Sequence, residues 1–317
     1  MSGDLAIRPL SLGDVVDRAV AVTRASFPAL FAVCLATGLP ALVLYRAYAG
    51  VLSELLEVTL SRHALPPAGA ERLFAWSAAV LGLSSLLQLV ASGAIAAVVA
   101  PRLLGEDGEA GLRPGLERAL SRRLAVGSAA AAVFGALFLA AGAGALPGAL
   151  AAWATEGLTR SLALALSAAG GLAALLWAVV RLALAPSAAG AEGLHGLRSL
   201  RRSARLMGAA PGERIAERPG IRVSAIFFVT LLLALAVNGL TGLPRAALTL
   251  ALGRGGPLSP LPLPAELGVG LLEAVGNAAV QPFGLVALTV FYFDRRARRE
   301  GLDLERWAEA LAGPEAS

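Results

Sequence analysis

The chain has 317 residues, of which 57% are hydrophobic and 15% are charged, whereas about a quarter of the residues in soluble domains are charged. A water-soluble fold could not bury this much apolar surface, so the composition predicts an integral membrane protein. The net charge of +5 comes from arginines that cluster between apolar runs and form no continuous stripe. We therefore expect no nucleic-acid partner.

Six apolar stretches are each long enough to cross a bilayer, which takes about 20 helical residues. They are residues 27–45, 73–100, 124–150, 161–185, 223–243 and 267–293. The first stretch is too long for the apolar core of a signal peptide, and three aspartates precede it, so it is expected to remain as a transmembrane helix. The sequence thus predicts an all-α polytopic protein whose six transmembrane helices occupy residues 27–293.

The arginines indicate the orientation of this bundle. Of the 27 arginines, 20 lie in residues 1–26, 101–123, 186–222 and 294–317, which alternate with loops that carry only 4. Because short cytoplasmic loops collect basic residues, both termini are predicted to be cytoplasmic.

Two of the arginine-rich segments have the periodicity of amphipathic surface helices. In residues 11–26, apolar side chains lie opposite charged ones, and Ser11 with Asp14 forms a capping-box pattern. In residues 197–207, apolar side chains recur at helical spacing below a row of arginines. Such helices lie at the bilayer interface; the alternative is that they pack beneath the bundle with their arginines in water.

The last apolar stretch ends in three aromatic residues, Phe291 to Phe293, and a basic tail, residues 294–317, follows at once. We interpret the aromatic residues as an interfacial belt and the arginines as contacts to anionic headgroups or to a membrane-protein partner. The candidate contacts in the two basic segments are Arg198, Arg201, Arg202, Arg205, Arg295, Arg296, Arg298 and Arg299. The tail continues with the periodicity of a short surface helix over residues 302–311.

The sequence holds no strong catalytic motif. Cys34 is the only cysteine, and His63 and His195 are the only histidines, so we expect no disulfide, metal site, cofactor or enzyme activity. The glycines of "AAGAGALPGAL" lie within an apolar stretch, where Gly144 and Gly148 have the G-x-x-x-G spacing of closely packed membrane helices.

The sixth stretch carries a candidate polar face inside the membrane. Glu273, Asn277 and Gln281 are four residues apart and share one side of a helix. At 1.5 Å per residue, Gln281 lies about 18 Å from the end of the stretch, near mid-membrane. Gln88 and Asn238 are further candidates from other stretches. These groups favour either a solute pathway or ordinary interhelical hydrogen bonds.

Three charged residues close to the ends of apolar stretches, Arg46, Arg181 and Arg245, need no special role. We interpret them as arginines whose side chains reach out of the membrane to water.

Three segments together resemble a known family. They are "LSLGDVVDRAVAVTRASFPALF", "RLALAPSAAGAEGLHGLRSLRRSARLMGA" and "FYFDRRARREGLDLE". They are similar to bacterial integral membrane proteins related to the membrane domain of glycerophosphoryl diester phosphodiesterases. The matching residues are Arg181, Glu192, Gly193, Arg202, Ser203, Tyr292, Asp294, Arg295, Arg298, Glu300, Gly301 and Asp303. The resemblance implies a helical bundle in the bacterial inner membrane, and the catalytic domain is absent because its barrel needs about 250 residues.

The leading hypothesis is a non-enzymatic inner-membrane protein that serves as an accessory or scaffold component of a membrane complex. The alternative is a transporter or permease for a lipid-like or small polar solute, which the polar face of the sixth stretch favours. A third hypothesis, an intramembrane lipid-modifying enzyme, would use Asp294, Glu300 and Asp303, but carboxylates flanked by arginines are usually ion-paired.

Overall fold

The computed structural model describes residues 10–62, 67–105, 112–208, 214–252 and 261–301. Within these ranges the chain is helical apart from turns and short connections, and six helical segments are long and apolar enough to cross a membrane. Each of the six overlaps one predicted stretch, which confirms the all-α class and the six candidate spans. The tail helix expected over residues 302–311 lies outside the described residues.

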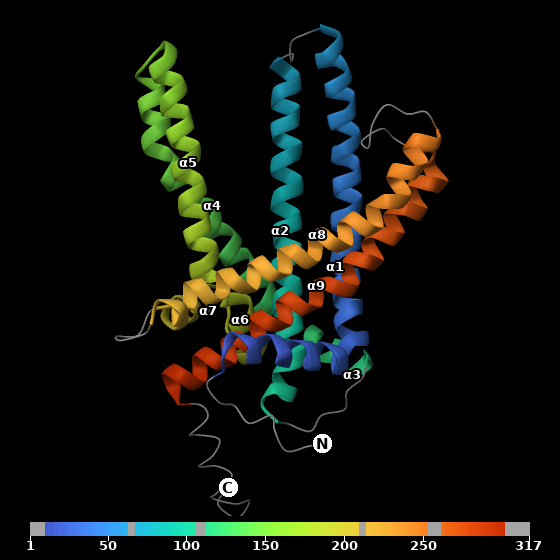
Figure 1. Ribbon diagram of the computed structural model, residues 1–317. Helices are drawn as coiled ribbons and strands as arrows, with labels where there is room; N and C mark the ends of the chain where they lie inside the picture. Colours follow the sequence, from blue (N-terminus) through green and yellow to red (C-terminus); the bar gives the residue numbers. More distant parts are fainter. Residues whose placement is uncertain (1–9, 63–66, 106–111, 209–213, 253–260, 302–317) are drawn as a thin grey trace, which may run out of the picture.

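The long helices form three antiparallel pairs (Figure 1). The pair α1 (Leu12–Arg62) and α2 (Pro67–Leu103) stands upright beside the pair α4 (Arg123–Trp153) and α5 (Gly157–Leu182). The third pair, α8 (Pro219–Ala251) and α9 (Leu263–Glu300), crosses α1 and α2 obliquely.

One end of the bundle, which we call the base, gathers the short helices. These are α3 (Leu112–Ser121), α6 (Ala185–Glu192) and α7 (Gly196–Leu206), with the 3-10 turn η1 (Ile215–Glu217) leading into α8. The start of α1 and the end of α9 also lie there (Figure 1), so both ends of the described chain reach the same side of the bundle.

The amphipathic segment over residues 11–26 is the first part of α1 and is not a separate helix. The predicted capping box is present, because the Ser11 amide donates to Asp14 Oδ2 at 2.9 Å and the Asp14 amide donates to Ser11 Oγ at 3.1 Å. The start of α1 lies across the base and the rest rises away from it (Figure 1). Pro28 lies inside α1 and removes one backbone hydrogen bond, which favours such a change of direction.

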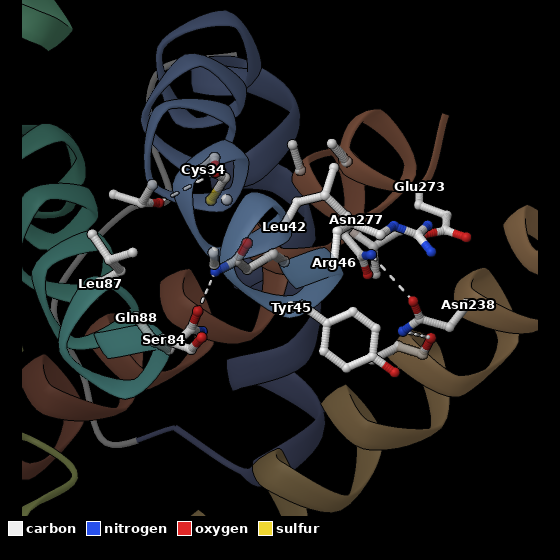
Figure 2. A pocket seen from close by; sticks show the side chains of 18 of the residues that line it. Cys34, Leu42, Tyr45, Arg46, Ser84, Leu87, Gln88, Asn238, Glu273 and Asn277 are labelled. Carbon is white, nitrogen blue, oxygen red and sulfur yellow. Dashed lines mark hydrogen bonds and ion pairs between the residues drawn. The ribbon is translucent and has the colours of Figure 1, made fainter. Parts of the chain in front are cut away.

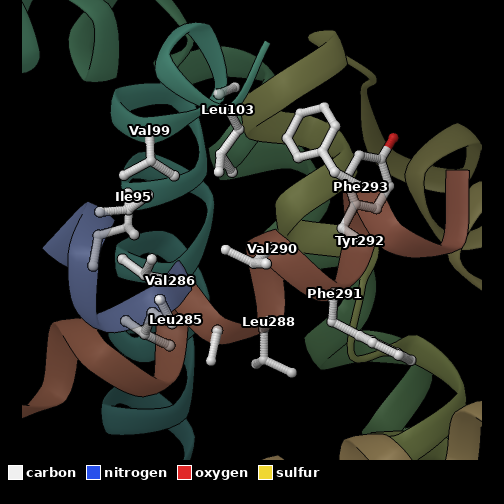
Figure 3. Close-up of a cluster of buried hydrophobic side chains, with 14 of the residues drawn as sticks. Ile95, Val99, Leu103, Leu285, Val286, Leu288, Val290, Phe291, Tyr292 and Phe293 are labelled. Carbon is white, nitrogen blue, oxygen red and sulfur yellow. The ribbon is translucent and has the colours of Figure 1, made fainter. Parts of the chain in front are cut away.

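An apolar core of buried side chains lies at the base. The second half of α9 packs there against α2 side chains such as Ile95 and Val99 (Figure 3). Phe291, Tyr292 and Phe293 are buried in this core, so the prediction of an interfacial aromatic belt is wrong. Apolar periodicity identified the helix, but it did not show that α1, α2 and α6 would enclose its last turns.

Helices α4 and α5 pack through glycines, as the G-x-x-x-G spacing predicted. A Cβ added at Gly144 would collide with the carbonyl oxygen of Gly170, and one added at Gly148 would collide with the backbone of Ser167. Ser167 also donates from Oγ to the Ala145 carbonyl at 2.7 Å. Away from this contact the pair exposes large apolar side chains such as Phe138 and Trp177, which is consistent with lipid contact.

Candidate functional site

A cleft bounded by α1, α2, α8 and α9 contains all five predicted intramembrane polar residues. Its cavity has a volume of about 740 Å³, and Gln88, Asn238, Glu273, Asn277 and Gln281 line it. Figure 2 shows Gln88, Asn238, Glu273 and Asn277 at this cleft, on separate helices. Tertiary structure therefore unites residues that the sequence placed on three different apolar stretches.

The amides in the cleft are hydrogen-bonded in pairs between helices. Gln281 of α9 donates from Nε2 to Gln88 Oε1 of α2. Asn277 of α9 donates from Nδ2 to Asn238 Oδ1 of α8 at 3.1 Å. Both pairs fit the packing interpretation of these residues, because a polar group in hydrocarbon needs a partner. They also border the cavity, so a ligand could exchange hydrogen bonds with them.

A group of four charged side chains lies in and beside the same cleft. Arg46 of α1 pairs with Glu273 and, at 3.1 Å, with Glu266, while Arg245 of α8 also pairs with Glu266. The interpretation of Arg46 and Arg245 as arginines that reach to water missed these contacts. The spacing of the two carboxylates could have indicated these ion pairs. Glu266 and Glu273 are seven residues apart and therefore share one face of α9.

The charges of this group compensate each other. The charges of two guanidinium groups and two carboxylates sum to zero. A ligand with a net charge would therefore leave one charge unpaired beside the apolar wall of the cleft, which is unfavourable in free energy. A neutral or zwitterionic ligand avoids this cost. Leu42 and Ala274 supply part of the apolar wall, and the amides supply donors and acceptors.

Cys34, the single cysteine, is fully buried and also lines the cavity. In the part of the chain that the structure describes, no group of three or more His, Cys, Asp or Glu side chains could hold a metal ion. The polar groups that line the cleft include amides and paired charges.

A second polar cluster, at the base, is centred on Asp294 of α9. Its carboxylate accepts a hydrogen bond from the Leu10 amide at 2.7 Å, from Arg222 of α8 at 2.8 Å and from Arg298 at 3.1 Å. Arg222 and Arg298 each donate in turn to the Leu10 carbonyl at 2.7 Å. Arg222 also lies over the Phe291 ring, 5.3 Å from its centroid. Asp294 thus joins the segment before α1 to α8 and α9.

A neighbouring group of charges joins α6, α7 and α9. Arg202 of α7 bonds to Glu192 at 2.9 Å and to Glu300 at 2.7 Å, and Arg296 pairs with the same two carboxylates. Tyr292 donates its hydroxyl to Glu192. Burial alone would lower the pKa of Arg202, but the hydrogen bonds to Glu192 and Glu300 raise this pKa above the ordinary arginine range. Arg202 therefore stays charged and bound.

The remaining two arginines of α9 cap the end of α7. Arg295 donates to the carbonyls of Leu206 and Gly208 at 3.1 Å, and Arg299 donates to the carbonyls of Arg205 and Gly208. The last carbonyls of a helix lack intrahelical partners and carry partial negative charge, which guanidinium groups satisfy. The side chain of Arg295 is completely buried.

The predicted headgroup contacts therefore divide into two sets. Arg202, Arg295, Arg296, Arg298 and Arg299 make contacts within the protein. The side chains of Arg198, Arg201 and Arg205 are exposed and make no hydrogen bond or ion pair with any described residue. The sequence could not separate the sets, because both consist of arginines in short basic runs.

Comparisons with protein-family models, with characterised proteins and with solved structures found no match to this chain. Several of the residues on which the expected resemblance to the phosphodiesterase membrane domain rested lie at the base, whereas Asp303 lies outside the described residues. Glu192, Arg202, Tyr292, Asp294 and Arg295 all belong to the contact networks of the base. Ser203 bonds there as well, linking the end of α5 to α7. These residues hold the base together and lie apart from the cleft.

Proposed function

We propose that this protein is a non-enzymatic permease of the bacterial inner membrane, with both termini in the cytoplasm, that binds a small neutral or zwitterionic solute or a lipid-like molecule in the α1/α2/α8/α9 cleft. The observation that carries this proposal is the convergence of polar side chains from four helices on one cavity of about 740 Å³. Helix packing alone would need the amide pairs, but it would not need a cavity beside them.

Three of the four cleft helices carry an internal proline next to a cleft-lining residue, and these prolines support a site whose helices can move. Pro40 lies inside α1, Pro244 inside α8 and Pro282 inside α9, and each is adjacent in sequence to a cleft-lining residue. An internal proline removes a backbone hydrogen bond and makes bending easier at that point. Transport through the cleft requires helices that change their separation, and interrupted helices at the binding site are common in transporters.

A cysteine introduced at Ser84 provides a direct test, because Ser84 lines the cavity and is half-buried, whereas Cys34 is fully buried and is replaced by alanine. The variant Cys34→Ala with Ser84→Cys is reconstituted in vesicles, and the rate at which a methanethiosulfonate reagent modifies the thiol at position 84 is measured with betaine, glycine, glycerol or glycerophosphocholine present. We expect at least one of these solutes to slow the modification and to leave loaded vesicles faster when the protein is present.

Matched variants make this test specific. The double variant Glu273→Gln with Gln281→Leu should abolish protection and flux, whereas Thr155→Ala, at the end of α4 and outside the cleft, should leave both unchanged. Flux that is equal in the double variant and the wild type would refute the permease proposal.

The α4–α5 pair favours a second candidate, an accessory or scaffold component of a membrane complex. This pair stands apart from the upper parts of α1 and α2 (Figure 1), and it exposes apolar side chains including Trp153 and Trp177. Purification of the tagged protein from native membranes in mild detergent, followed by mass spectrometry of proteins and lipids, separates the two candidates. A stoichiometric protein partner supports the scaffold function, and a retained solute or lipid without a partner supports the permease.

A further inference from the structure

Five arginines at the base form a surface that none of the contact networks uses. Arg122 and Arg123, at the junction of α3 and α4, and Arg198, Arg201 and Arg205 of α7 are all exposed. None of these five side chains makes a hydrogen bond or an ion pair with a described residue. We call these five residues the α4/α7 arginine surface.

Contacts between α4 and α7 bring these arginines together. The Gly196 amide donates to Ser128 Oγ at 3.2 Å, which places the start of α7 against the first turns of α4. The guanidinium group of Arg122 lies directly against Gly193, at the end of α6. On α7, positions 198, 201 and 205 share one helical face. The arginines of α7 therefore lie on a helix that is in contact with α4, whose start carries Arg122 and Arg123.

Among the described residues, no carboxylate is paired with these five arginines. Glu192, which lies next to this region in the chain, is already bonded to Arg202, Arg296 and Tyr292. Neighbouring like charges repel each other, and the repulsion persists unless counter-anions occupy the region. The arginines of α9, by contrast, all bind carboxylates or carbonyls within the protein.

The position of the surface identifies the source of the anions. Arg123 is the first residue of a candidate membrane span, and arginines at the end of such a span are expected near the level where hydrocarbon gives way to headgroups. Leu124 and Leu197, which are 74% and 65% exposed, stand among the arginines. Exposed leucines between cations are typical of surfaces in contact with lipid, because acyl chains cover the apolar side chains while the guanidinium groups reach phosphates.

We infer that the α4/α7 arginine surface binds the phosphate groups of anionic phospholipids in the leaflet around the base. The planar guanidinium group can donate two parallel hydrogen bonds to the oxygens of one phosphate. Lipid bound there would stabilise the contact between α4 and α7 and thereby the position of the α4–α5 pair at the base. This inference does not depend on solute binding in the cleft.

Native mass spectrometry of the full-length protein in detergent tests the inference through the apparent Kd of the first bound phosphatidylglycerol, with phosphatidylcholine as the neutral reference. The wild type should prefer phosphatidylglycerol. An arginine near an anionic surface contributes about 1 kcal/mol, roughly a five-fold change in Kd, so the variant Arg198→Gln with Arg205→Gln should weaken phosphatidylglycerol binding roughly 25-fold. Phosphatidylcholine binding should not change.

The matched control is Arg24→Gln with Arg160→Gln, which removes two exposed arginines that lie outside this surface. It should keep the preference for phosphatidylglycerol. Replacing Arg198 and Arg205 with lysine should reduce the preference for phosphatidylglycerol only in part. Lysine keeps the positive charge but cannot make the paired hydrogen bonds of a guanidinium group. Circular dichroism and size-exclusion chromatography confirm that each variant is folded, as expected for side chains without partners.

Two results would overturn the inference. One is an unchanged phosphatidylglycerol Kd in the folded Arg198→Gln, Arg205→Gln variant, or an equal loss in the control. The other is that these substitutions abolish binding of a soluble polyanion, heparin, and leave lipid preference intact; the surface would then bind a soluble acidic partner.

Discussion

The base and the cleft both contain charged side chains inside the helical bundle, but the two regions hold them differently. At the base, the Asp294 side chain is fully buried and that of Arg222 is 5% exposed, and backbone groups of Leu10 take part in the same network. In the cleft, Arg46 and Glu273 are each 18% exposed and border a cavity. Charges at the base are fixed by several elements at once, whereas charges in the cleft can exchange partners.

The apolar contacts differ in the same way. The large core of the base encloses side chains from α1, α2, α6, α8 and α9, as in a water-soluble domain. The upper helices touch through glycines and amide pairs and leave their leucines exposed. Because lipid solvates those leucines, burying them between helices contributes little free energy of association. The helices are held together by close backbone contact and by interhelical hydrogen bonds.

The largest loss of stability is expected from Asp294→Asn. This change leaves Arg222 buried without its ion partner, and removing one member of a buried pair costs about 3–5 kcal/mol. Denaturant unfolding in detergent, followed by circular dichroism, measures the change. Glu117→Gln is the control, because its exposed pair with Arg113 contributes about 0–1 kcal/mol. Similar losses in both variants would contradict the structural role of the base network.

Gly190→Ala should have the next largest effect. An added Cβ would collide with the Gly93 carbonyl where α6 meets α2, and overpacking of this kind costs about 1–3 kcal/mol. Gly144→Ala makes the same test in the α4–α5 pair. In Gly142→Ala nothing lies within 4 Å of the added Cβ, so its free energy of unfolding should stay the same or rise slightly. Comparison of thermal unfolding midpoints would show whether close packing matters equally in both regions.

Glu273→Gln should cost less than Asp294→Asn at the base. Arg46 keeps its pair with Glu266, but one positive charge of the group is left uncompensated at a partly buried site, so we expect a loss between that of an exposed pair, about 0–1 kcal/mol, and that of a buried pair, about 3–5 kcal/mol. Its main effect should be on the protection by solutes of the thiol introduced at position 84. A loss of stability as large as that of Asp294→Asn would show that the cleft charges are structural.

Gln281→Leu should have the smallest effect on stability, since interhelical hydrogen bonds in membranes average about 0.6 kcal/mol. A double-mutant cycle with Gln88→Leu isolates the pair, because each single change leaves one amide without its partner. We expect the double variant to be no less stable than either single one. Additive losses would contradict the hydrogen bond between the two side chains.

Local sequence was sufficient for several features of this protein. Six apolar stretches, each about as long as a bilayer is thick, determined the helical class and the candidate spans. The Ser11–Asp14 cap and the Gly144–Gly148 contact were also predictable, because both depend on residues three or four positions apart along one helix.

Only the tertiary structure decided how the polar residues are used. The sequence identified Gln88, Asn238 and Gln281 as polar groups in apolar stretches, but their partners lie on other helices. It likewise could not distinguish the buried Arg295 from the exposed Arg205, since an arginine can donate hydrogen bonds both to headgroup phosphates and to backbone carbonyls. The physical reason is that hydropathy and spacing describe a single helix, whereas burial and pairing depend on which helices meet.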